Sequence, residues 1–163
     1  MLFFKKKVKE EPVKSLKAFV SGTAIPITEV NDPVFSSKVL GDGIAIKPSE
    51  QTVVAPCDGV ISKIAKDSKH AIGMTLNNGA ELLLHIGLDT VSLNGEGFKV
   101  FVKEKDKVKQ GDKLLEFDKE FIEGKGLETT SMLVIANSDE YPNAEYISGM
   151  EVTQNETEIC RFE

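Results

Sequence analysis

The chain has 163 residues, of which 40% are hydrophobic and 28% are charged, and its formal net charge is −6. This composition predicts one soluble globular domain, and no apolar run is long enough to cross a membrane. The acidic balance argues against nucleic acid as a partner, while two distant cysteines exclude a disulfide framework and indicate a cytoplasmic setting.

The first 18 residues differ from the rest of the chain. Leu2, Phe3 and Phe4 precede a cluster of lysines, whereas a signal peptide has the opposite order and a longer apolar segment. We expect residues 1–18 to form a flexible segment and residues 19–163 to form the folded domain. A weaker alternative is that the aromatic and basic residues of this segment act as a peripheral arm on an anionic membrane.

From Val20 onward, short apolar runs alternate with turn sequences such as Asp42-Gly43, Asp58-Gly59 and Gly95-Glu-Gly97. Turn signals at this spacing predict an all-β fold, an antiparallel β-sandwich or flattened barrel with at most short helical turns. The predicted strands are 44–46, 53–55, 60–64, 71–76, 81–88, 99–102, 113–117, 132–136, 151–154 and 158–162. Helical turns are expected only at 33–39 and 119–124.

The chain's two histidines, His70 and His85, fall in one predicted hairpin. Asn78-Gly79 suits a two-residue type I′ turn, which would place Ile72 opposite His85 and His70 opposite Gly87. The two imidazoles would then be diagonal neighbours on one face, whereas a register shift of one residue would separate them. The same face is expected to carry Ile72, Met74 and Leu83.

Two imidazoles that face one space suit two kinds of chemistry. They could bind zinc, as a zinc or regulatory binding module, but a third ligand is missing locally because Cys57 and Cys160 lie in unrelated segments. Alternatively, one neutral imidazole attacks phosphorus while the other hydrogen-bonds the phosphoryl oxygens. The residues alone leave both zinc binding and phosphoryl transfer open. No cofactor is expected.

A rival interpretation rests on two loosely similar segments, 54–61 and 108–116, which resemble the hammerhead motifs of lipoyl and biotinyl carrier domains. Glu116-Phe-Asp-Lys119 is similar to the segment whose lysine carries lipoate, so a swinging-arm carrier modified on Lys119 is an alternative. Such a lysine should lie at an exposed hairpin tip with a strand directly after it. The residues after Lys119 do not predict that strand.

A longer resemblance begins with Gly79-Ala-Glu-Leu-Leu-Leu-His-Ile-Gly-Leu-Asp-Thr-Val91, in which His85 follows three aliphatic residues. Further matching segments are Asp32-Pro-Val-Phe35, Val39-Leu-Gly-Asp-Gly-Ile-Ala-Ile46, Ala55-Pro-Cys-Asp-Gly59, Gly95-Glu-Gly-Phe98 and Gly111-Asp112. Together these segments, within residues 19–137, resemble the glucose-type enzyme IIA proteins of the bacterial sugar phosphotransferase system. The resemblance implies a duplicated hybrid motif of the barrel-sandwich type.

The resemblance also implies roles for individual residues. His85 would accept a phosphoryl group through Nε2, and His70 would be the second active-site histidine. Asp32 and Asp89 would be acidic residues beside the site, with Ser68 and Thr90 in support. The apolar docking rim would be Val34, Phe35, Val39, Leu40 and Val91. Each of these surrounding residues also has a purely structural interpretation, as part of the core, a turn or a strand end.

The implied function is that of a phosphotransferase component that accepts phosphate from phosphorylated HPr and passes it to a cysteine of the IIB domain of a glucose-family permease. Regulatory partners are a further expectation, and membrane association would be peripheral, through the permease or the N-terminal segment. Met1 favours a free-standing protein over a piece of a permease. The chain departs from the family pattern at Ala65-Lys-Asp-Ser68, which lacks the bulky aromatic of some relatives and so alters the rim.

Overall fold

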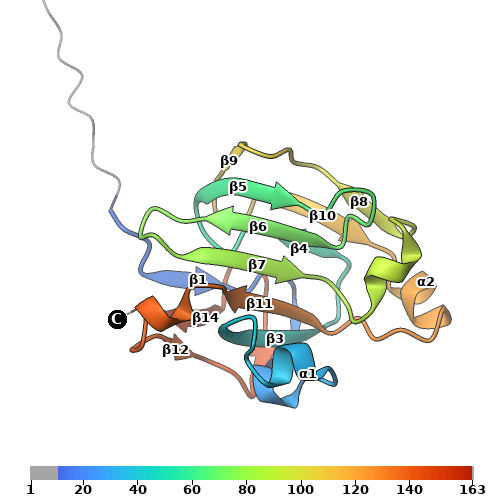
Figure 1. The fold of residues 1–163 in the computed structure, drawn as a ribbon, viewed down its shortest axis with the longest axis horizontal. Helices are drawn as coiled ribbons and strands as arrows, with labels where there is room; N and C mark the ends of the chain where they lie inside the picture. The colour runs from blue at the N-terminus through green and yellow to red at the C-terminus, as the bar shows by residue number, and fades with distance from the viewer. Residues whose placement is uncertain (1–10, 163) are drawn as a thin grey trace, which may run out of the picture.

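The computed structural model describes residues 11–162, which form a β-rich domain with two short α-helices (Figure 1). The strands are β1 (Ser15–Lys17), β2 (Gly22–Pro26), β3 (Asp42–Pro48), β4 (Thr52–Val54), β5 (Gly59–Ile64), β6 (Ala71–Thr75), β7 (Glu81–His85), β8 (Phe98–Val100), β9 (Lys107–Val108), β10 (Lys113–Phe117), β11 (Ser131–Ile135), β12 (Glu145–Tyr146), β13 (Met150–Val152) and β14 (Glu158–Arg161). The helices are α1 (Pro33–Ser36) and α2 (Lys119–Gly124), with 3-10 turns η1 (Ile27–Glu29), η2 (Thr90–Leu93) and η3 (Ser138–Glu140). Within residues 11–162, no helix has the length and apolar character needed to span a membrane.

The strands form three sheets, and the pairings are antiparallel. The large sheet has the order β13-β2-β3-β11-β7-β6-β5-β9, and the two smaller sheets are β1-β14-β12 and β4-β10-β8. The predicted antiparallel β-sandwich is therefore confirmed, and its sheets do not close into a barrel. Each strand predicted from the sequence overlaps an observed strand, and both predicted helical turns are present.

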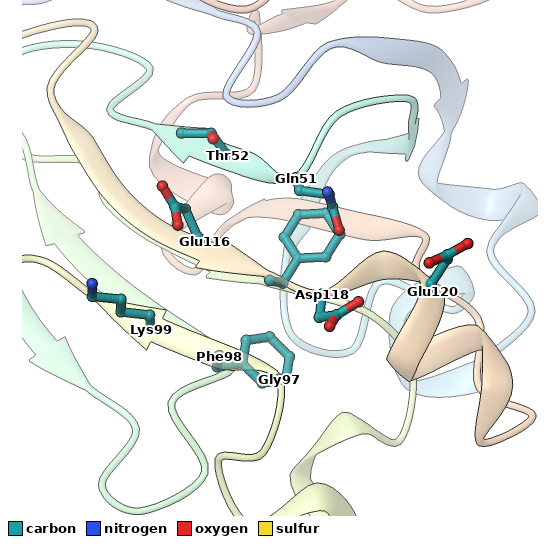
Figure 2. A pocket seen from close by; sticks show the side chains of 9 residues that line it. Gln51, Thr52, Gly97, Phe98, Lys99, Glu116, Asp118 and Glu120 are labelled. Atoms are coloured by element: carbon teal, nitrogen blue, oxygen red, sulfur yellow. The ribbon is translucent and has the colours of Figure 1, made fainter.

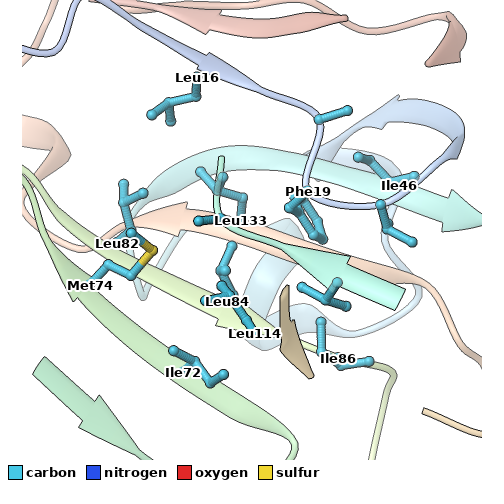
Figure 3. Packing of buried hydrophobic residues seen from close by; sticks show 14 of the residues in the cluster. Leu16, Phe19, Ile46, Ile72, Met74, Leu82, Leu84, Ile86, Leu114 and Leu133 are labelled. Atoms are coloured by element: carbon cyan, nitrogen blue, oxygen red, sulfur yellow. The ribbon is translucent and has the colours of Figure 1, made fainter. Parts of the chain in front are cut away.

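Two apolar clusters hold the domain together. The larger cluster combines residues of the large sheet with residues of the smaller sheets, and it includes Leu16, Ile72, Leu84, Leu114 and Leu133 (Figure 3). The smaller cluster contains Phe35 of α1 together with Met132 and Val134 of β11, with Leu83 of β7 packed against it. Along β7, Leu84 thus belongs to the main core while Leu83 points to the opposite face. The smaller cluster fixes α1 against the face of the large sheet opposite the main core.

Part of the expected flexible N-terminal segment is instead a strand. Ser15–Lys17 forms β1 and pairs with β14, and Leu16 within it is fully buried. This burial explains why the boundary expected at residue 19 is too late. The aromatic and basic residues of the proposed membrane arm lie outside the described residues.

The predicted register of the β6–β7 hairpin is wrong by one residue. Ala71 lies opposite His85, and Ile72 lies opposite Leu84. The cause is a three-residue loop: Gly79 N–H donates to Leu76 O at 3.0 Å, and Gly79 has a positive φ of 92°. Asn78 has no positive φ, so this is not the type I′ turn expected from Asn78-Gly79. Ile72 and Met74 consequently face the main core and not the histidines.

Candidate active site

His85 is the last residue of β7 and is partly buried beneath α1. On the neighbouring strand it pairs with Met132, and the ring of Phe35 lies 4.9 Å from its own ring, centroid to centroid, at 60°. Helix α1 is held in place at its start, where the carboxylate of Asp32 accepts the Val34 N–H at 3.0 Å. An apolar wall therefore covers one side of the imidazole.

The backbone two residues further on fixes the protonation of the His85 ring. Nδ1 of His85 lies 2.9 Å from the carbonyl oxygen of Gly87. Because a carbonyl only accepts hydrogen bonds, Nδ1 carries the proton and the neutral ring has its free lone pair on Nε2. Gly87 reaches this position with φ +77°, and a Cβ there would lie 2.5 Å from Cγ2 of Thr90. The position therefore requires glycine.

His70 meets His85 edge-on, with ring centroids 4.6 Å apart and ring planes at 87°. The predicted proximity of the two imidazoles is thus confirmed, although not by the predicted pairing. His70 lies one residue before β6 and follows Lys69, whose φ is +57°, so the alternation of faces within the strand does not apply to it. The contact depends on the positive φ of Lys69 and not on strand register.

Ser68 orients the second histidine. Its buried hydroxyl lies 2.9 Å from Nδ1 of His70, which is itself buried. When this hydroxyl donates to Nδ1, the ring keeps its proton on Nε2 and can donate it to an acceptor. The pair then presents one nucleophilic nitrogen and one N–H donor.

Burial disfavours the charged form of both rings. Desolvation, helped by the nearby His70, lowers the pKa of His85 to about 4, although the hydrogen bond to Gly87 and the charge of Asp32 act in the opposite direction. Burial also lowers the pKa of His70. Both imidazoles are therefore neutral near pH 7, which is the state that a nitrogen nucleophile needs.

The other expected site residues lie around this pair in different ways. Asp32 is near enough to act on the charge of His85, whereas Asp89 is exposed and directly precedes η2, with φ +59°. Thr90 is fully buried, and its hydroxyl donates to Ile86 O at 2.6 Å. Thr90 thus fixes the turn after the strand.

The expected docking rim divides into two parts. Val34, Val39, Leu40 and Val91 are 40–72% exposed, whereas Phe35 is 3% exposed and belongs to the smaller core cluster. For Phe35 the plainer interpretation as core is correct, and its edge additionally covers His85. Sequence reasoning missed the roles of Gly87 and Met132, although the glycine directly after the His-Ile dipeptide was a usable signal.

Neither alternative site is favoured by the geometry. Among residues 11–162, no group of three or more histidine, cysteine or acidic side chains is arranged to bind a metal ion. Lys119 is the first residue of α2 and pairs with Glu123 at 3.2 Å, so it is not at a hairpin tip. Burial raises the pKa of the thiols of Cys57 and Cys160 to about 12, which leaves them unreactive at neutral pH.

A polar surface depression of about 690 Å³ opens over β4, β8 and β10, away from the histidines (Figure 2). Two of its polar side chains serve the fold: Gln51 accepts the Lys119 N–H, and Asp118 caps α2 by accepting the Phe121 N–H. A third, Glu116, pairs with Lys113 Nζ at 2.9 Å.

Comparison with known proteins places this site in a family. Residues 14–141 match the family described as phosphoenolpyruvate-dependent sugar phosphotransferase system, EIIA 1. The chain is 44% identical over 158 residues to the glucose-specific EIIA component of Oceanobacillus iheyensis, which covers 97% of this chain and 95% of that protein. It is 47% identical over 135 residues to the glucose-specific EIIBCA component of Corynebacterium glutamicum, covering 83% of this chain but only 19% of that longer protein.

Among solved structures, the glucose permease IIA from Mycoplasma capricolum superposes with a TM-score of 0.81 and 36% sequence identity, covering 98% of each chain. The match spans nearly the whole chain, so it includes the whole sandwich. The chain is a member of the EIIA family of the phosphoenolpyruvate-dependent sugar phosphotransferase system.

Proposed function

We propose that this protein accepts a phosphoryl group from phosphorylated HPr on Nε2 of His85 and passes it to a cysteine in the IIB domain of a glucose-family permease. The observation that supports the acceptor most directly is the 2.9 Å contact between Nδ1 of His85 and Gly87 O. It leaves Nε2 unprotonated, so no separate general base is needed. The family and its glucose-specific relatives support the substrate class.

The transfer is a displacement at phosphorus. The lone pair of His85 Nε2 forms the new N–P bond as the N–P bond to the donor histidine breaks, and that electron pair stays on the donor nitrogen. In the second step, the thiolate of the IIB cysteine forms an S–P bond, and the electron pair of the breaking N–P bond returns to Nε2. Phosphoryl transfer of this kind depends on positioning and on stabilisation of the oxygens.

The neighbouring groups supply that stabilisation. A neutral His70 with its proton on Nε2 can donate a hydrogen bond to the phosphoryl oxygens, and Ser68 holds it in that form. The ring of Phe35 and the buried surroundings keep water from the phosphohistidine. Asp32 lies close enough to meet basic residues that a donor protein presents around its own phosphohistidine.

The partners would dock over the exposed apolar rim of Val34, Val39, Leu40 and Val91. An apolar rim of this kind favours docking governed by shape complementarity more than by strong charge pairing. The EIIBCA organisation named for the Corynebacterium glutamicum relative supports a IIB domain as the acceptor. We place the transfer in the cytoplasm, with membrane association only through the permease or the N-terminal segment, and we take the folded domain as the carrier unit.

The experiment that tests this proposal is incubation of the protein with phosphoenolpyruvate, enzyme I and HPr, followed by intact mass measurement. One added phosphate that is labile in acid and stable in base identifies phosphohistidine. Omission of HPr is the control and should leave the mass unchanged. An unmodified protein, or a phosphate stable in acid, would reject the proposal.

A further inference from the structure

The hydroxyl of Ser131 contacts Gly87, the residue whose carbonyl orients His85. Ser131 is the first residue of β11 and is fully buried, and the next residue, Met132, pairs with His85. Its Oγ donates to Thr129 O at 2.9 Å and accepts the Gly87 N–H at 3.4 Å. Since a hydroxyl has one proton, donation to Thr129 leaves its lone pairs for the amide.

Gly87 needs such contacts because glycine has no side chain to restrict its backbone. Its φ of +77° sets the direction of the carbonyl that receives the His85 proton. The peptide after Gly87 is held by Leu88 N–H, which donates to Glu128 O at 2.9 Å. The peptide before it is held by Thr90, which donates to Ile86 O, and by Ser131, which accepts the Gly87 N–H. Both peptides that flank Gly87 are therefore held from outside.

We propose that Ser131 is a positioning residue for phosphoryl transfer: its hydroxyl holds Gly87 so that the Gly87 carbonyl keeps the proton of His85 on Nδ1 and leaves Nε2 free to attack. The inference rests on the proposed function, because it takes Nε2 as the accepting atom. Ser131 touches no reacting atom, so it acts only through Gly87. Its effect should appear in the tautomer of His85 and in the rate of phosphorylation.

Loss of the Ser131 hydroxyl should change the His85 tautomer as well as the stability, whereas loss of a purely structural serine would change the stability alone. Without the hydroxyl, the buried Gly87 N–H has no acceptor there, and rotation of the Gly87 backbone toward another partner relieves this loss. That rotation also moves the carbonyl away from Nδ1. The ring then populates the form with its proton on Nε2, which cannot attack phosphorus.

The test compares Ser131→Ala with two other variants. Ser131→Thr keeps a hydroxyl and suits a strand, so it should rescue. Thr129→Ala is the matched control, because it also removes a buried hydroxyl near the start of β11, one that donates to Glu123 at 3.0 Å and not to the Gly87 segment. Nitrogen-15 NMR of the unphosphorylated proteins at pH 7.5 reads the His85 tautomer. Single-turnover transfer from phosphorylated HPr gives the rate.

We expect Ser131→Ala to show a measurable population of the Nε2–H tautomer and a transfer rate about five- to tenfold below wild type, the size expected for one neutral hydrogen bond. Ser131→Thr and Thr129→Ala should keep the wild-type tautomer and rate. Wild-type values in Ser131→Ala overturn the inference, even if its melting temperature falls.

Two further outcomes are separable. If the wild type takes no phosphate, the proposed function fails and the inference about transfer fails with it, whereas a normal wild type with an unaffected Ser131→Ala rejects only the inference. If Ser131→Ala does not fold, hydrogen exchange of the Gly87 amide in the wild type tests whether Ser131 holds this amide. Slow exchange supports the contact with Ser131, and fast exchange overturns it.

Discussion

The ring of His70 lies edge-on to the ring of His85, with centroids 4.6 Å apart, and both rings are neutral near pH 7 because burial lowers the pKa of each. The two residues differ in what holds them. A backbone carbonyl orients His85, whereas the hydroxyl of Ser68 orients His70. In the proposed function His85 is the nucleophile and His70 the donor, and this difference makes the two roles testable one at a time.

Replacement of the acceptor should abolish phosphorylation without unfolding the domain. His85→Ala removes a partly buried ring at the end of β7, outside both apolar clusters. We expect it to keep a cooperative thermal transition and to gain no phosphate in the intact mass assay. Full labelling of this variant would show that another residue is the acceptor.

Replacement of the second histidine should act mainly on the second transfer. His70→Gln keeps an amide donor, so His85 should still become phosphorylated, while transfer to purified IIB should slow. Loss of one charge-assisted contact in the transition state typically lowers the rate by about two to three orders of magnitude. The measurement is single-turnover transfer from the phosphorylated variant to IIB. A wild-type rate would leave His70 with a structural role only.

The low pKa of His85 predicts a specific dependence of stability on pH. Its pKa falls from 6.5 to about 4 in the folded state, so the unfolded chain binds an extra proton between these values. Stability contributed by neutral His85 is thus fully present above pH 6.5 and is lost as the pH falls toward 4. Urea unfolding across this range should show the wild type losing stability relative to His85→Gln. Parallel pH profiles of the two proteins would contradict the shift.

Gly87→Ala should destabilise the domain and disturb the His85 tautomer together. The new Cβ would lie 2.5 Å from Thr90 Cγ2 and 3.0 Å from Glu128 O, at a backbone φ of +77°. We expect a loss of about 2–4 kcal/mol in the free energy of unfolding. Gly126→Ala is the control, since Gly126 has a similar φ of +79° but no atom within 4 Å of the new Cβ. Equal losses in both variants would mean that only backbone strain is being measured.

The exposed rim should tolerate a charge in the free protein but not in the docked one. Val39 is 72% exposed, so Val39→Asp should change the free energy of unfolding by no more than about 0.5 kcal/mol. We expect the KM for phosphorylated HPr to rise, because the carboxylate must be desolvated on docking. Met150→Asp, on the edge strand β13, is the control and should leave KM unchanged. A normal KM for Val39→Asp would place docking elsewhere.

The sequence was sufficient to predict the strands that combine apolar runs with strong turn signals. It did not reveal β2, which begins with Gly22 and ends with Pro26, two residue types that indicate turns. It also did not reveal β1, where Leu16 is a single buried residue between polar neighbours, nor the two-residue strands β9 and β12. Such segments carry too few residues for a periodic pattern. Their pairing depends on partners far away in the chain, as β1 depends on β14.

At the site, the sequence predicted which two residues meet but not how. The loop after β6 takes three residues because Asn78 is held at both ends of its side chain: Oδ1 accepts the Ala80 N–H, and Nδ2 donates to Val13 O. The second contact joins segments 65 positions apart, so local turn preferences could not include it. Lys69, directly before His70, has a positive φ within a local turn in which its N–H donates to Ala65 O, and a lysine gives no sequence signal for such a conformation.

The contacts of Val13 with the β6–β7 loop also determine how the domain can be attached to other proteins. Val13 N–H donates to Asn77 Oδ1, so the chain enters the sandwich beside this loop, and β1 then pairs with the last strand, β14. Both ends of the folded region thus lie on the side where the hairpin turns, while the histidines lie at its open end, five residues along each strand. A tether at either end would attach to the domain on the side opposite the histidines. A free-standing and a fused carrier would therefore present the same face to their partners.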